Sequence, residues 1–197
     1  MLKNTSIIIH LNKLYREKAE AFATARCPDV GLYEKRGGFK REDIVVGALG
    51  EMAVYKFLTT QRFKVNRPDF TIHSKKSYDA DLSDLKRNFH VKAQSMSSRK
   101  KYGASWLMQR SDPIIVKPVT NNYLVPCNVD LNTNWVEVHG LLSIPQLVAK
   151  DCIEECSVPW FRKYKVALYM ETINLKLTKY SRWGLIKRKR EEDNGQR

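Results

Sequence analysis

Residues 78–96 of this chain read YDADLSDLKRNFHVKAQSM, and this stretch decides the fold class. The segments Tyr78–Leu82 and Asn88–Met96 each have the two-residue period of a β-strand. The polar residues Ser83–Arg87 between them are typical of a turn. We therefore expect a β-hairpin at this position.

Side chains of the second strand alternate between two faces. One face carries polar residues and the other apolar ones: His90, Lys92 and Gln94 against Phe89, Val91 and Ala93. Asp79 and Asp81 likewise share one face of the first strand. In a suitable register, two carboxylates, an ammonium, an imidazole and an amide converge on one patch.

These groups are the components of metal-assisted phosphodiester hydrolysis. A hard divalent cation such as Mg²⁺ prefers oxygen ligands, and one or two carboxylates normally hold it together with water and phosphate. A neighbouring lysine can orient or help to deprotonate the attacking water, or stabilise charge on the phosphate. The hairpin therefore predicts a hydrolytic site.

The rest of the chain surrounds these strands with helices. Helical periodicity is found over residues 10–26, 43–58 and 143–156. Further strands are predicted over 63–72, 123–129 and 135–142, and residues 165–173 favour a late strand. This order is typical of an α/β fold with a mixed sheet.

The second helix carries a third carboxylate. It starts at Asp43, a suitable N-cap, and Gly47 and Gly50 within it can let another backbone come close. Glu51 lies on the flank of the apolar stripe, three residues after Ala48. Because an unpaired carboxylate at the edge of a core is costly, Glu51 needs a partner. A salt bridge to a lysine of the sheet and a metal ion are the two open interpretations.

Composition and charge limit the classes of protein to which this chain can belong. The 197 residues are 43% hydrophobic and 28% charged, as in an ordinary globular protein. We expect one domain over residues 1–180 and a flexible basic tail over 181–197. A net charge of +14 predicts a polyanionic partner, with nucleic acid first and an anionic membrane surface second.

Several other classes are excluded. No run approaches the roughly 18 apolar residues of a membrane span, and the N-terminus lacks the pattern of a secretory signal. The four cysteines are too few and too scattered for a disulfide scaffold. We therefore expect an intracellular, cytoplasmic protein with reduced thiols, in the host cytoplasm if a phage encodes it.

The motif Gly50–Ala53 on a helix, followed by Asp81 and then by His90–Lys92, resembles the PD-(D/E)xK nuclease superfamily. In these restriction-endonuclease-like phosphodiesterases, an aspartate on one strand precedes (D/E)-x-K on the next, often after a helix with GE-x-A. The spacing of eleven residues from Asp81 to Lys92 fits a short hairpin of that family. Gln94 is similar to the ExKxQ variant, and the resemblance covers roughly residues 43–96.

The resemblance implies a restriction-endonuclease-like fold, in which a mixed central sheet is flanked by helices. It implies a Mg²⁺- or Mn²⁺-dependent endonuclease that cuts DNA to 5′-phosphate and 3′-hydroxyl ends. Asp81 would be the principal metal ligand, Glu51 a second and the carbonyl of Val91 a third. Lys92 would lie beside the nucleophilic water, and His90 and Gln94 would line the metal or the scissile phosphate.

His90 departs from the family pattern, which has an acidic residue two positions before the lysine. Imidazole is a poorer ligand for Mg²⁺ than a carboxylate, so the site has one negative charge less. Three consequences stay open: Glu51 and Asp79 compensate as ligands, His90 favours Mn²⁺, or the site is degenerate. In the last case, the chain is a non-catalytic nucleic-acid-binding protein. A basic assembly factor is a third class.

Clusters of basic residues supply candidate DNA contacts. Arg99, Lys100 and Lys101 follow the proposed active strand and could neutralise phosphates beside the cut. A second cluster, either a clamp on the duplex or a solvated loop, consists of Lys35, Arg36, Lys40 and Arg41. A third, in which rings alternate with cations, spans residues 160–165. A homodimer would supply two sites for two strands.

Overall fold

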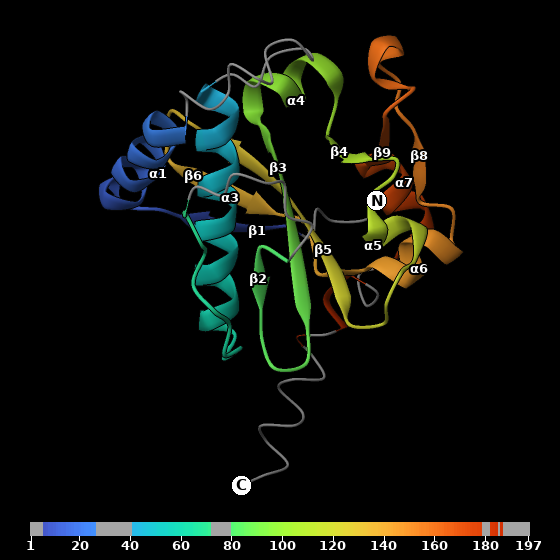
Figure 1. The fold of residues 1–197 in the computed structure, drawn as a ribbon, viewed down its shortest axis with the longest axis horizontal. Helices are drawn as coiled ribbons and strands as arrows, with labels where there is room; N and C mark the ends of the chain where they lie inside the picture. Colours follow the sequence, from blue (N-terminus) through green and yellow to red (C-terminus); the bar gives the residue numbers. More distant parts are fainter. Residues whose placement is uncertain (1–5, 27–40, 72–79, 179–181, 185, 187–197) are drawn as a thin grey trace, which may run out of the picture.

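The computed structural model describes residues 6–26, 41–71, 80–178, 182–184 and 186. Within these residues the chain has a mixed α/β fold, in which a curled mixed sheet is flanked by helices (Figure 1). The predicted fold class is therefore confirmed at this level. No helix in the described part of the chain is both long and apolar enough to cross a membrane.

The main sheet has six strands and contains a hairpin at the predicted position, but the first strand of this hairpin is Leu82–Ser83 instead of the predicted Tyr78–Leu82, so its turn begins one residue later than predicted. Its order is β1 (Ile7–His10), β6 (Trp135–Val138), β5 (Asn122–Asp130), β3 (Asn88–Ser95) and β2 (Leu82–Ser83), with β7 (Leu142–Ser143) pairing with β5. β3 is parallel to β5, and the other pairings are antiparallel. β3 therefore pairs with β5 along its whole length, whereas β2 covers only the start of its other edge.

One face of this sheet is covered by α3 (Arg41–Thr60), with α1 (Lys13–Arg26) on its outer side (Figure 1). α3 is apolar on most of its surface, and it is therefore buried between α1 and the sheet. Phe89 and Val91 of β3 belong to this core, and Ala93 packs against it. The predicted alternation of side chains along β3 is thus confirmed.

A second, smaller layer covers the other face. It consists of a three-stranded sheet, β4 (Ser105–Gln109), β9 (Lys165–Tyr169) and β8 (Ile153–Glu155), with α5 (Pro113–Val116), α6 (Ile144–Ala149) and α7 (Met170–Lys176). These elements enclose a core of their own around Trp106. The indole Nε1 of Trp106 donates a 2.8 Å hydrogen bond to the carbonyl of Cys127 in β5, which ties the layer to the main sheet. α4 (Met96–Tyr102) leads from β3 into β4.

Several predicted elements differ in the structure. The described residues 63–71 form no strand; Asn66 instead binds both the N–H and the carbonyl of Ser83. The helix predicted over 143–156 ends at Ala149, because Asp151 has a positive φ of 50° and reverses the chain into β8. The helix expected from Asp43 starts two residues earlier, so Asp43 lies in its first turn. β1 and β4 were not predicted.

The end of the described chain also differs from expectation. The basic tail was expected to start at residue 181, but Trp183 packs edge-on against Phe57 of α3, with ring centroids 5.7 Å apart. Arg182 is buried and Ile186 belongs to the main core. The packed part of the chain therefore extends to residue 186. The three cysteines within the described residues are free and buried, as expected for reduced thiols.

Candidate active site

A close contact between α3 and β3 positions the first site residue. A Cβ atom built on Gly50 would lie 2.8 Å from the Cβ of Ala93 and 3.5 Å from Cγ1 of Val91. Such a distance is shorter than real Cβ contacts, so only glycine lets the helix backbone approach the strand this closely. Gly47, one turn earlier, would meet nothing within 4 Å. The contact at Gly50 therefore sets Glu51 beside β3.

Asp81 lies where the β2–β3 ladder ends. The ladder pairs Leu82 with Phe89 and stops there, and the Asp81 side chain replaces the next backbone bond. Its Oδ2 accepts a 2.6 Å hydrogen bond from the N–H of Val91. In an extended strand, the N–H and C=O of one residue point to the same edge. The Val91 carbonyl is thus directed to the edge that the Asp81 carboxylate occupies.

Glu51, Asp81 and Lys92 interact electrostatically although they come from three elements. Burial and, after it, the negative charge of Asp81 raise the pKa of Glu51 to about 8, although the Lys92 ammonium opposes both. Burial also raises the pKa of Asp81, which Lys92 and the hydrogen bond from Val91 counteract. All three side chains are half-buried. The structure therefore brings together the three residues that the sequence predicted as one site.

This donor set fits a divalent cation. Two carboxylates face one ammonium, so the fully ionised site has an excess negative charge in a poorly solvated place. Mg²⁺ normally takes one or two carboxylates together with backbone oxygens and water, so two carboxylates and the Val91 carbonyl are sufficient. No group of three His, Cys, Asp or Glu side chains with metal-site geometry occurs among the described residues. Asp79, the other predicted ligand, lies outside them.

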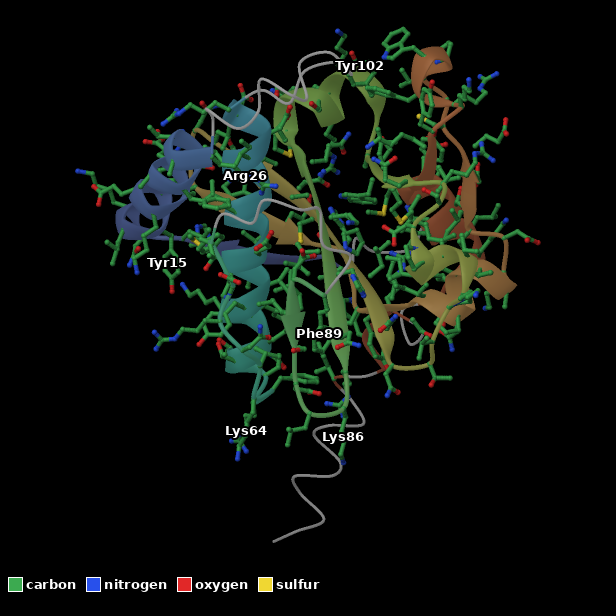
Figure 2. The ribbon with its side chains drawn as sticks, in the orientation of Figure 1. Tyr15, Arg26, Lys64, Lys86, Phe89 and Tyr102 are labelled. Carbon is green, nitrogen blue, oxygen red and sulfur yellow. The ribbon has the colours of Figure 1, made fainter. Side chains whose placement is uncertain are left out.

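Two further charges act on Glu51 and were missed in the sequence. The carboxylate of Asp69 raises the pKa of Glu51, and the guanidinium of Arg26 lowers it. Phe70 packs against Phe22 of α1 with ring centroids 5.1 Å apart, which brings this segment to the Arg26 end of α1 (Figure 2). Asp69 was overlooked because its segment was assigned to a strand and because no spacing links it to the hairpin.

His90 is buried against the second core. Its partner in the β3–β5 register is Leu124, a member of that core. Burial and the charge of Lys92 lower the pKa of His90 to about 4, while Asp112 partly opposes the shift. His90 is therefore neutral at pH 7. It adds no charge to the pair of carboxylates.

Gln94 has a structural role. Its Oε1 accepts hydrogen bonds from the N–H of Ser105 and from Nδ2 of Asn128, both at 3.1 Å. Its Nε2 donates to the carbonyl of Gly103 at 3.0 Å. Both polar atoms of the amide are thus engaged in tying β3 to the start of β4, and the predicted contact with the metal or phosphate gains no support.

The predicted DNA contacts separate into two kinds. Arg99 binds Oε2 of Glu137 at 2.5 Å and is part of a buried network, which also contains Ser6, Asn128 and His139. Arg41 binds the hydroxyl of Thr24 and the carbonyl of Glu20, and so joins α3 to α1. Lys100 and Lys101 are exposed. Lys35, Arg36 and Lys40 lie outside the described residues.

Comparisons with known proteins leave this site as the main guide to function. No family model matches the chain, and no curated protein or solved structure matches it either. Glu51, Asp81, Val91 and Lys92 supply the geometry and charge from which a function can be inferred.

Proposed function

We propose that this chain is a metal-dependent DNA endonuclease with a restriction-endonuclease-like fold of the PD-(D/E)xK type. The observation that carries the proposal is the hydrogen bond from the N–H of Val91 to the carboxylate of Asp81. Val91 directly precedes Lys92, and Asp81 interacts electrostatically with Glu51. The electrostatic interactions of Glu51, Asp81 and Lys92 beside this hydrogen bond support the proposal. The net charge of +14 supports a polyanionic substrate.

In this proposal the residues have separate roles. Glu51, Asp81 and the Val91 carbonyl hold Mg²⁺ or Mn²⁺, which supplies Lewis acidity and a more acidic water when bound. Nζ of Lys92 orients the attacking water and stabilises charge on the phosphate oxygens. The water loses a proton to solvent as its oxygen bonds to phosphorus, and the bond from phosphorus to the 3′ oxygen breaks. That oxygen takes a proton, which leaves 5′-phosphate and 3′-hydroxyl ends.

Cleavage of supercoiled plasmid in Mg²⁺ or Mn²⁺ tests the proposal. We expect nicking that EDTA abolishes and that falls by about 100-fold or more in Lys92→Met, Asp81→Asn and Glu51→Gln. Lys86→Ala is the matched control, because Lys86 lies in the exposed turn of the same hairpin (Figure 2). Nicking that survives in Lys92→Met and Asp81→Asn would contradict the proposal, since a contaminating nuclease ignores these variants.

A second function is favoured by one observation. His90 is buried and neutral where the resembled pattern has a carboxylate, so β3 contributes no acidic side chain to the site. A non-catalytic DNA-binding protein with a degenerate nuclease fold would retain the basic surface without hydrolysis. It predicts salt-sensitive DNA binding in EDTA and no nicking in either metal. The same plasmid assay, read beside a binding assay, separates the two functions.

A further inference from the structure

The tip of the β8–β9 hairpin displays aromatic rings to solvent. The short helical turn Pro159–Phe161 and the residues after it form this tip. Trp160 is 67% exposed and Tyr164 is 59% exposed. Rings of this size usually bury most of their surface, so two of them held in water on one turn require an explanation.

The backbone of the tip is tightly bonded, so the rings are not exposed through fraying. Tyr164 donates its N–H to the carbonyl of Phe161 at 2.9 Å, and its own carbonyl accepts from the N–H of Arg110 at 2.9 Å. Nη2 of Arg110 also donates to the carbonyl of Arg162 at 3.0 Å. Below the tip, Cys156 is buried and Val166 belongs to the second core. The fold therefore presents the rings on a fixed platform.

Cations accompany these rings. Arg162 and Lys163 are exposed, and Nζ of Lys163 lies 5.5 Å from the centroid of the Tyr164 ring. The same pairing recurs on α4, where Nζ of Lys101 lies 4.9 Å from the ring of the exposed Tyr102. The two pairs of ring and cation lie at opposite ends of β4. Its first residue, Ser105, follows α4 and pairs with Tyr169, whereas its last residue, Gln109, pairs with Lys165 beside the tip.

A partner for this tip must offer flat apolar faces and negative charge together. Unpaired nucleotides have both, because their bases stack on aromatic rings and their phosphates bind cations. Duplex DNA hides its base faces, so it would use the cations alone. We propose that the tip is a binding site for single-stranded DNA, in which bases stack on Trp160 and Tyr164 and phosphates bind Arg162 and Lys163. This inference does not require a metal or cleavage.

Intrinsic fluorescence measures this binding on the full chain in EDTA, where hydrolysis does not interfere. The probe is oligothymidylate of about 16 nucleotides, the upper site size of a single binding module. We expect it to quench the emission of Trp160, and Trp160→Phe to remove this quenching while it retains most of the affinity by anisotropy. Trp160→Ala should weaken binding by about tenfold, as expected for the loss of one stacked base.

The salt dependence distinguishes stacking from phosphate contact. Lys163→Ala should reduce the slope of log K against log[salt] by about 0.7, the value for one phosphate of a single strand. Trp160→Ala should leave that slope unchanged. Leu175→Ala and Lys117→Ala remove an exposed apolar and an exposed charged side chain elsewhere, and neither should alter binding.

Three results would overturn the inference. They are unchanged single-strand affinity in Trp160→Ala, an equal loss of affinity for a duplex of the same length in Trp160→Ala, and Trp160-dependent binding of anionic vesicles without binding of the oligonucleotide. Failure of the proposed nuclease activity would be a separate result, since that activity is read by plasmid nicking in Mg²⁺ or Mn²⁺ and depends on Lys92.

Discussion

Two polar clusters beside β3 differ in how their charges are balanced. In the buried network around Glu137, the carboxylate accepts hydrogen bonds from Ser6 and Arg99, and these bonds with the nearby His139 lower its pKa despite burial. In the candidate site, the pKa of both carboxylates is raised, because burial outweighs the single ammonium of Lys92. We call the network of Glu137, Ser6, Arg99 and His139 the closed cluster, because its charges are balanced. We call Glu51, Asp81 and Lys92 the open cluster, because it has a deficit of positive charge.

This difference separates structural from functional polar groups. A buried polar side chain kept for stability is normally paired, as Asn128 is with Gln94, His139 and Arg99. A pair of carboxylates whose burial disfavours their charge costs folding free energy, and such costs concentrate at sites that bind or react. The contrast therefore favours Glu51 and Asp81 over Glu137 as the ligands of the cation in the proposed function.

Arg99→Ala tests the closed cluster and should have the largest effect on stability. It leaves the Glu137 carboxylate, which is 7% exposed, without its cation. Loss of one partner of a buried ion pair costs about 3 kcal/mol, and the partial exposure of Arg99 places the value at the lower end of the known range. For a chain of this size, the melting temperature should fall by about 6–12 °C.

Lys100→Ala is the control for this variant, since Lys100 is the exposed neighbour of Arg99 on α4. We expect its melting temperature to stay within about 2 °C of the wild type. DNA affinity should show the reverse order, with salt-dependent binding weakened in Lys100→Ala. An Arg99→Ala protein that melts normally would mean that Glu137 does not depend on Arg99.

Glu51→Gln tests the open cluster, and it should stabilise the protein. The folded pKa of about 8 lies above the usual 4.5, so the folded state retains a proton that the unfolded state has lost. This contribution to stability is complete below pH 4.5 and is lost as pH rises through 8. Glutamine does not titrate, so the variant should exceed the wild type by a margin that is small at pH 4.5, grows with pH and is largest near pH 8.5.

Thermal melting in EDTA across this pH range measures the difference. Glu171→Gln changes an exposed carboxylate of α7 and should show no such growing gap. If Glu51→Gln is instead less stable than the wild type at high pH, Glu51 forms a salt bridge with the sheet. That was the other interpretation of this residue from the sequence.

Added Mg²⁺ should close the open cluster and raise the melting temperature. At ten times the dissociation constant, a ligand of the folded state contributes about 1.4 kcal/mol, which corresponds to about 3–5 °C here. The shift should disappear in Glu51→Gln and in Asp81→Asn, while Arg99→Ala should keep it. An equal shift in all three variants would place the bound Mg²⁺ elsewhere on the chain.

The sequence predicted the open cluster better than the closed one. Periodicity predicts α3 and β3, and with them the position of Glu51 on the flank of its helix and the alternation of side chains around Lys92. The network around Glu137 cannot be predicted from the sequence, because its members are far apart in the chain and no local pattern links Arg99 to residue 137. The sequence also predicts a helix where β8 lies, because β8 forms by pairing with β9, a tertiary contact that no local pattern indicates.

Gly50→Ala and Gly47→Ala test how the close contact between α3 and β3 holds the open cluster. Alanine favours a helix over glycine by up to about 1 kcal/mol, so Gly47→Ala, which meets no neighbour, should stabilise the protein by that amount. At Gly50 the new Cβ meets that of Ala93 at 2.8 Å, and this overpacking costs about 1–3 kcal/mol. Gly50→Ala should therefore melt lower than Gly47→Ala and lose part of the shift with Mg²⁺, because α3 moves Glu51 away from Asp81. Equal melting temperatures would show that α3 does not depend on this contact to position Glu51.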